Sequence, residues 1–155
     1  MQLKNIIKNS LLTIPYIILL LIILLAIEAP MLEYQRLQIS SKVYEILRNI
    51  CHQVPTRCLW IKTSNIGLCA RCFSIYITLF LTGLYLMKYN IRRIFWKYSF
   101  ILIIPCIIDG FSQYLNLRLS NNALRTITGG LAGIGLGLIL FPLYFRLVGL
   151  ITERS

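Results

Sequence analysis

Long apolar stretches constrain this chain more than any other feature. The stretch from Leu11 to Ile27 is broken only by Thr13, Pro15 and Tyr16, and it approaches the roughly 20 residues that a membrane-spanning helix needs. Of the 155 residues, 57% are hydrophobic and 14% are charged, against roughly 45–50% and about 25% in soluble domains. A chain of this size cannot bury so much apolar surface in water. Lipid must therefore solvate part of it, which excludes an ordinary cytosolic enzyme and a disordered protein.

The net charge is strongly positive. Sixteen Lys and Arg residues stand against five Asp and Glu, a formal charge of +11. The basic residues lie between the apolar stretches, where they anchor a protein to anionic headgroups and set its topology. No basic stripe and no recognised nucleic-acid motif accompanies them. The charge therefore predicts a membrane lipid as partner and no nucleic acid.

Four apolar segments are candidate membrane spans: 11–27, 73–89, 98–117 and 127–148. The third reaches spanning length only if it includes Pro105, Asp109 and Gln113. Because Pro30 follows directly where a signal peptide would be cleaved, we interpret the first segment as a retained anchor. The chain is then a single domain overall, with an N-terminal transmembrane anchor at 1–30 and the remaining three spans within 31–155.

The connection between the first two segments has two halves. Its first half carries apolar residues at helical spacing: Ile39, Val43, Ile46, Leu47 and Ile50. This pattern predicts an amphipathic helix at the membrane surface or over the end of the bundle. The second half, 51–71, is rich in Pro, Cys, Gly and basic residues and predicts an ordered loop. The expected fold class is an all-α polytopic membrane protein with four transmembrane helices, one amphipathic helix and a Cys/His-containing loop.

Basic residues in the connections predict the orientation. The two sides of the membrane carry equal numbers of Lys and Arg. The short connection between the second and third spans, however, has four of them in or beside it: Lys88, Arg92, Arg93 and Lys97. This density favours a multi-pass protein of the cell membrane with both termini in the cytoplasm. With four spans, the first and third connections lie on one side whichever way the protein is inserted. Their polar residues are expected to meet there.

Four of the five cysteines fall within a short segment, and the only histidine, His52, is beside the first of them. Cys69 and Cys72 form a C-x-x-C pair, which can bind a metal, exchange thiols or close a disulfide. The candidate metal ligands are Cys51, His52, Cys69 and Cys72, for zinc or another transition metal. Because Cys51 and His52 are adjacent, we expect one to bind the ion and the other to support it. Cys106, in the third span, is expected to be a small apolar packing residue.

A second group of polar residues lies in and beside the third and fourth spans. Asp109 is the only acid inside a span, and such a residue persists when it faces the bundle interior with a partner. Gln113 shares its helical face. The expected counter-charge is Arg125 or Arg118, or Arg71 or Arg57. Asn121 and Asn122 precede the fourth span, where they either cap it or, with an arginine, bind an anion such as a lipid phosphate.

Three glycines recur every four residues along one face of the fourth span: Gly129, Gly133 and Gly137. Small residues at this spacing allow another helix to approach closely. The alternative is that glycine is simply frequent in membrane helices. The pattern predicts a helix–helix partner on this face.

Several short motifs together resemble one family. They are Cys51-His52-Gln53 with Pro55 and Arg57, Gly67 to Tyr76 around the C-x-x-C pair, Pro105, Asp109-Gly110 with Gln113, Ser120 to Asn122 with Arg125, and Thr128-Gly129. In order and spacing they resemble the domain-of-unknown-function family numbered two thousand and eighty-five, small predicted membrane proteins of archaea and bacteria. Cys58 and Phe73-Ser74 depart from that pattern. The resemblance implies a helical membrane protein and brings no established reaction.

The leading hypothesis is an integral membrane protein whose Cys/His metal site packs against a polar intramembrane pocket for a lipid headgroup or another anionic ligand. The predicted ligand-binding residues are Gln53, Arg57, Arg71, Gln113, Asn121, Asn122 and Arg125, and Asp109 is the candidate catalytic residue. Nothing in the sequence shows the open metal position that catalysis needs, so enzymatic activity stays undecided. One alternative is a thiol-disulfide redox protein using Cys69 and Cys72, with Cys51 resolving. Another is a non-enzymatic assembly or accessory subunit.

Overall fold

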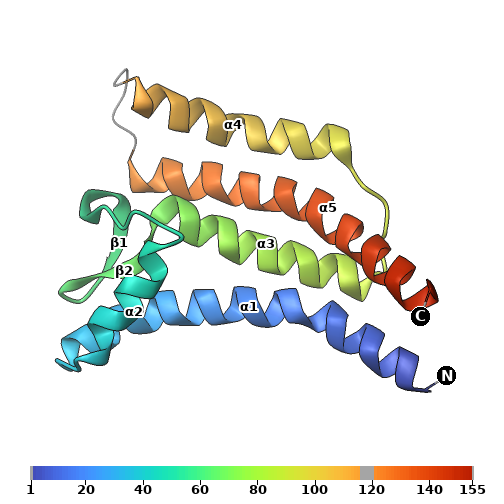
Figure 1. Cartoon of the computed structure of the whole chain (residues 1–155). Coiled ribbons are helices and arrows are strands. Elements are labelled where there is room, and N and C mark those ends of the chain that lie inside the picture. The colour runs from blue at the N-terminus through green and yellow to red at the C-terminus, as the bar shows by residue number, and fades with distance from the viewer. Residues whose placement is uncertain (1, 116–120, 155) are drawn as a thin grey trace.

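The computed structural model describes residues 2–115 and 121–154 of the chain (Figure 1). Helices dominate it, and a short two-stranded sheet lies at one end. The elements, in chain order, are α1 (Gln2–Tyr34), α2 (Ile39–Arg48), the 3-10 helix η1 (Pro55–Arg57), β1 (Cys58–Ile61), β2 (Ser64–Cys69), α3 (Ala70–Lys88), α4 (Trp96–Tyr114) and α5 (Asn122–Arg154).

The long helices lie side by side in the order α4, α5, α3, α1 (Figure 1). The contact between α3 and α5 is the most extensive one, α4 packs along α5, and α1 packs against α3 and against β2. Helix α2 and the sheet gather at one end of this layer, and the N- and C-termini lie at the other. The end of α4 and the start of α5 lie at the same end of the molecule as α2 and the sheet.

Three of the helices are long and apolar enough to cross a membrane: Asn9–Tyr34, Ala70–Lys88 and Asn122–Thr152. Helix α4 is not among them, because Lys97, Asp109 and Gln113 lower the mean hydropathy of its 19 residues. The predicted third span, 98–117, corresponds to α4, although residues 116 and 117 lie outside the described part of the chain. The apolar criterion therefore supports three of the four predicted spans.

The expectation of a purely helical fold is wrong in one place. Within the predicted Cys/His loop, β1 and β2 form an antiparallel hairpin in which Cys58 pairs with Cys69 and Ile61 with Ser64. The chain reverses at Lys62, which has a positive φ of 55°. Side chains from this hairpin bury against helices, because Ile66 and Leu68 are 2% and 0% exposed. That packing stabilises a strand pair that would be marginal alone.

The predicted amphipathic helix is confirmed as α2. Val43 and Leu47 are buried, whereas Ile39 and Ile46 are exposed. The buried side of α2 packs on α1 and β2 in one apolar cluster, whose members are Ala26, Ala29, Val43, Leu47, Cys51 and Leu68. Gly67 makes this approach possible, because a Cβ there would lie 2.3 Å from Leu47 Cδ1. The cluster anchors the start of the cysteine segment.

The glycine face of α5 lies against α3 of the same chain. A Cβ on Gly133 would lie 2.5 Å from the Ile75 carbonyl oxygen, and one on Gly129 would lie 2.6 Å from the Arg71 carbonyl oxygen. A Cβ on Gly137 would lie 2.8 Å from Thr82 Cγ2. These glycines bring the α3 and α5 backbones together and place the start of α3 beside the start of α5.

Candidate functional site

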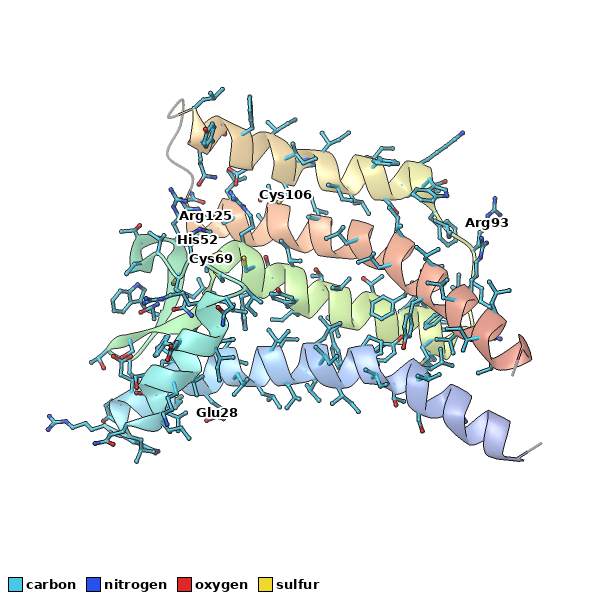
Figure 2. All side chains as sticks on the ribbon, in the orientation of Figure 1. Glu28, His52, Cys69, Arg93, Cys106 and Arg125 are labelled. Atoms are coloured by element: carbon cyan, nitrogen blue, oxygen red, sulfur yellow. The ribbon has the colours of Figure 1, made fainter. Side chains whose placement is uncertain are left out.

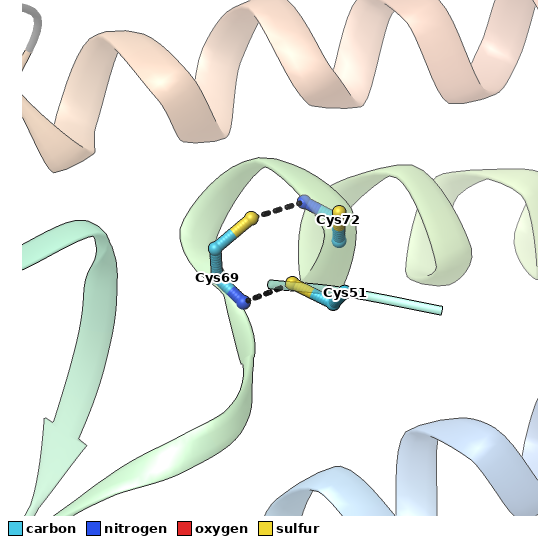
Figure 3. A group of neighbouring side chains, drawn as sticks. All are labelled: Cys51, Cys69 and Cys72. Carbon is cyan, nitrogen blue, oxygen red and sulfur yellow. Dashed lines mark hydrogen bonds between the residues drawn. The ribbon is translucent and has the colours of Figure 1, made fainter. Parts of the chain in front are cut away.

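Three cysteines converge where α2, β2 and α3 meet (Figure 3). The sulfur atoms of Cys51, Cys69 and Cys72 all lie within 4.8 Å of one another. Cys51 is buried, the other two are partly buried, and all three are free thiols. A set of three soft ligands at this spacing can hold a transition metal ion or exchange disulfides.

Local backbone structure sets the positions of these sulfurs. Cys51 follows the last turn of α2, where its N–H donates to the Leu47 carbonyl at 3.0 Å. Cys69 ends β2 and caps α3, and its sulfur accepts from the Cys72 N–H at 3.5 Å. The Cys69 N–H in turn donates to the Cys51 sulfur at 3.2 Å. The positive end of the α3 dipole and these N–H groups favour thiolates.

The thiols differ in acidity according to their hydrogen bonds. The pKa of Cys51 is lowered, because Cys69 and Cys72 both donate hydrogen bonds to its sulfur. The pKa of Cys69 is raised, chiefly because its thiol donates to Cys51. These hydrogen bonds favour the thiolate form at Cys51 over that at Cys69.

The predicted ligand His52 and the two remaining cysteines lie outside this cluster. The side chain of His52 is exposed, and neither of its nitrogens belongs to the group of close ligand atoms. Cys58 is fully buried, and its sulfur donates to the Val54 carbonyl at 3.3 Å. Burial raises the Cys58 pKa to about 11. Cys106 is on α4, near Arg71 and Asp109.

A polar network begins directly beside the cysteines. Asp109 is 3% exposed and forms an ion pair with Arg71, which stands between Cys69 and Cys72 in the chain. Gln113 donates to the Asp109 carboxylate at 2.9 Å. The prediction that Asp109 faces inward toward an arginine is therefore confirmed, with Arg71 as the partner. Arg118, another predicted partner, lies outside the described residues.

The network continues across α5 to the hairpin. Arg125, which is 7% exposed, donates to Gln113 Oε1 at 3.1 Å and to Asn122 Oδ1 at 3.0 Å. Asn122 donates to the Cys58 carbonyl oxygen at 3.0 Å. These bonds join α4, α5 and β1, so the predicted meeting of polar residues from the two connections is confirmed for the residues that the structure describes. Figure 2 labels His52, Cys69 and Arg125 at this end and Arg93 at the opposite one.

Three more predicted ligand-binding residues lie in the cysteine segment or directly before α5. Gln53 is buried with a positive φ of 51°, and its amide donates to the Tyr44 and Gly67 carbonyls at 2.9 Å each. Arg57 ends η1 and is exposed. Asn121 caps the start of α5, where its side chain accepts from the Leu124 N–H at 2.8 Å.

The cysteines and the network form one continuous site. Arg57 and Arg71 both lie within electrostatic range of Arg125. Cys69 and Asp109 also act on Arg125, with the opposite sign. Among the described residues nothing accepts a hydrogen bond from the buried Nε of Arg71. The site thus places positive charge, a buried carboxylate and soft sulfur ligands together, an arrangement suited to a cation at the sulfurs and an anion at the arginines.

One residue of this end was absent from the predicted site. Cys58 has no informative spacing to the C-x-x-C pair, and only the hairpin register places it opposite Cys69. The sequence signal for Cys58 is a cysteine, a residue type that is usually buried, within a polar segment. This signal is weak, because a free cysteine often acts as a small core residue.

A family of known proteins matches the segment that carries the site. The profile of the DUF2085 family, described as predicted membrane proteins, matches residues 51–139. This chain belongs to the DUF2085 family. An uncharacterized protein of Methanocaldococcus jannaschii is 36% identical over 115 residues, which are 71% of this chain and 73% of that protein. An uncharacterized protein of Methanothermobacter thermautotrophicus is 38% identical over 96 residues, 59% of this chain and 85% of that protein. No solved structure matches the chain.

The DUF2085 match confirms the resemblance seen in the short motifs. It begins at Cys51 and runs into α5, so it includes the hairpin, α3, α4 and both groups of site residues. Helices α1 and α2 precede it. The family identifies the chain as a membrane protein with transmembrane helices and names no reaction.

Proposed function

We propose that this protein is a membrane metalloprotein in which Cys51, Cys69 and Cys72 bind zinc or another thiophilic transition metal ion. The observation that carries the proposal is the approach of the three sulfurs to within 4.8 Å of one another. Zn–S bonds of about 2.3 Å at tetrahedral angles place sulfurs roughly 3.8 Å apart. The observed spacing therefore needs only small side-chain adjustments to accept an ion.

Electrostatics supports a cation at this position. Binding deprotonates each cysteine, and thiolates at this distance repel one another unless a positive ion lies between them. The N–H groups of Cys69 and Cys72 already donate to sulfurs, and such bonds are typical of the shell that orients metal ligands. His52 is next to Cys51 in the chain, with its side chain exposed.

Metal content tests this proposal. The full chain, purified in detergent with a reductant and without added metal, is expected to carry about one zinc-type ion per chain. Cys51→Ser and Cys72→Ser are expected to lose it, whereas Cys106→Ser on α4 keeps it. A metal-free protein that gains a disulfide between two of the three clustered cysteines on mild oxidation would overturn the metal site and favour thiol-disulfide exchange.

Beside the metal site, the arginine network is proposed to bind an anionic group such as a lipid headgroup. Arg57, Arg71 and Arg125 outweigh the single carboxylate of Asp109. Arg57 is exposed and Arg71 keeps 23% of its side chain accessible, so both can reach a ligand. The role that the geometry supports for Asp109 is to orient Arg71.

Lipid dependence of thermal stability tests the anion site. Detergent-solubilised protein is expected to melt at a higher temperature with an anionic phospholipid than with a zwitterionic one. Arg57→Gln should abolish most of that difference. Arg93→Gln, at the opposite end of the molecule (Figure 2), serves as the matched control. An equal response of the two variants would contradict the assignment.

We also propose that α4 crosses the membrane as a fourth span. It packs along α5, and its 19 residues extend about 28 Å, close to the hydrocarbon thickness. Its outward side carries exposed apolar residues, namely Phe100, Ile101, Ile104, Ile107, Ile108 and Phe111. Ser99 and Asp109 face inward. In the cell membrane, both termini would then be cytoplasmic and the cysteine site would face the other side.

A further inference from the structure

A fourth cysteine is buried next to the cluster. Cys58 is 0% exposed and is the register partner of Cys69 in the antiparallel hairpin. Directly paired residues on antiparallel strands project to the same face, with Cβ atoms about 4.5–5.5 Å apart. Cys58 also lies within electrostatic range of Cys51. Cys58 therefore lies on the same face of the hairpin as Cys69, beside the three clustered cysteines.

Two residues compete for the fourth position around an ion. The side chain of His52 is exposed, and its neighbour Cys51 already points into the cluster. Adjacent residues cannot both chelate easily from one side of the chain. Cys58 comes from a different element and is buried, and its sulfur donates to the Val54 carbonyl at 3.3 Å and accepts a side-chain hydrogen bond from Asn65. Burial and register both favour Cys58.

We propose that Cys58 is the fourth ligand, so that the ion is held by Cys51, Cys58, Cys69 and Cys72. This inference rests on the proposed metal site. Rotation about the Cα–Cβ bond of Cys58 breaks its contacts with Val54 and Asn65 and turns the sulfur toward Cys69. One Zn²⁺ and four thiols give a tetrathiolate complex of charge −2 and release four protons to solvent.

A four-sulfur site has two structural consequences. It is closed, as in structural zinc sites, so the ion fastens the hairpin to the end of α2 and the start of α3. It also couples to the arginine network, because Asn122 donates to the Cys58 carbonyl and also accepts from Arg125. The negative complex would lie beside Arg71 and Arg125, whose positive charges offset it.

X-ray absorption of the zinc-loaded full chain tests the inference without any substitution. Four sulfur neighbours at about 2.3 Å are expected. Three sulfurs with one nitrogen or oxygen neighbour would overturn the role of Cys58 and leave the three-cysteine site standing. A chain that binds no zinc would overturn the proposed function itself. The two failures are therefore distinguishable.

Cobalt substitution provides a second readout. Cys58→Ser is expected to lose about one quarter of the thiolate-to-cobalt charge-transfer absorbance per bound ion and to bind cobalt more than about 10-fold more weakly. His52→Ala and Cys106→Ser should leave the spectrum unchanged. An unchanged spectrum in Cys58→Ser, or a changed one in His52→Ala, would contradict the assignment. Circular dichroism of each variant verifies that its helices are intact.

Discussion

At the scale of single residues, the end of the molecule that holds the site depends on polar side chains that hydrogen-bond to one another in a low-dielectric environment. Asp109 accepts from both Arg71 and Gln113, and Gln113 accepts from Arg125. Each side chain therefore holds its neighbour, and removing one leaves a buried partner uncompensated. The consequences of substitution should be larger here than on the exposed surface.

Replacing the buried carboxylate tests this dependence. Asp109→Asn should lower the free energy of unfolding by about 2–3 kcal/mol, less than the 3–5 kcal/mol typical of fully buried pairs, because the Arg71 side chain is 23% exposed. Thermal unfolding in detergent measures the change. Glu28→Gln, which alters an exposed acid on α1, should have little effect. Similar losses in the two variants would show that the ion pair contributes no particular stability.

Gln53 offers a second test at this scale, because its side-chain amide donates hydrogen bonds to two backbone carbonyls. Gln53→Ala would leave the Tyr44 and Gly67 carbonyls without their donor and should cost about 2 kcal/mol. The exposed Gln35→Ala is the control. If Gln53→Ala instead weakens anionic-lipid binding at unchanged stability, its role is ligand binding, as the sequence pattern predicted.

At the scale of elements, the α3–α5 pair positions the site, because its close approach aligns the starts of both helices. The glycines on α5 allow this approach, and Ser74 and Thr78 on α3 face them. In the membrane such packing, rather than hydrophobic burial, stabilises helix pairs. A side chain inserted between the two backbones should therefore separate the cysteines from the arginine network.

Two neighbouring glycines make a matched pair of substitutions. A Cβ on Gly133 would lie 2.1 Å from Thr78 Oγ1 and 2.5 Å from the Ile75 carbonyl oxygen, whereas one on Gly130 meets nothing closer than 3.5 Å. Gly133→Ala should destabilise the protein by about 1–3 kcal/mol, and Gly130→Ala should be neutral. Unfolding temperatures in detergent decide between them. Equal effects would show that the glycine spacing has no packing role.

At the scale of the whole molecule, the candidate groups for chemistry that the structure describes lie toward one end of the helix layer, and the basic connection near Arg93 lies at the other (Figures 1 and 2). If α4 spans the membrane beside α5, the termini share a side and the site faces the opposite one. Orientation would then decide which compartment supplies the proposed metal ion and the proposed anionic ligand.

Reporter fusions test this topology. A reporter fused after Ser155 should report a cytoplasmic location, because the short basic connection between α3 and α4 favours that side. A reporter inserted after Arg36, in the turn between α1 and α2, should report the other side. The opposite locations for the two reporters would show that the protein is inserted the other way round. The same location for both would contradict an even number of spans.

The sequence by itself determined the membrane class, the helices and the family, because apolar length and helical periodicity are local properties. It also predicted that Cys51, Cys69 and Cys72 lie near Asp109, since four spans would bring the first and third connections to one side. The hairpin, the structural position of Gln53 and the choice of Arg71 as partner of Asp109 were decided only by tertiary structure. These features depend on strand register and on which helix faces approach, and contacts between residues far apart in the chain leave no periodic signal in it.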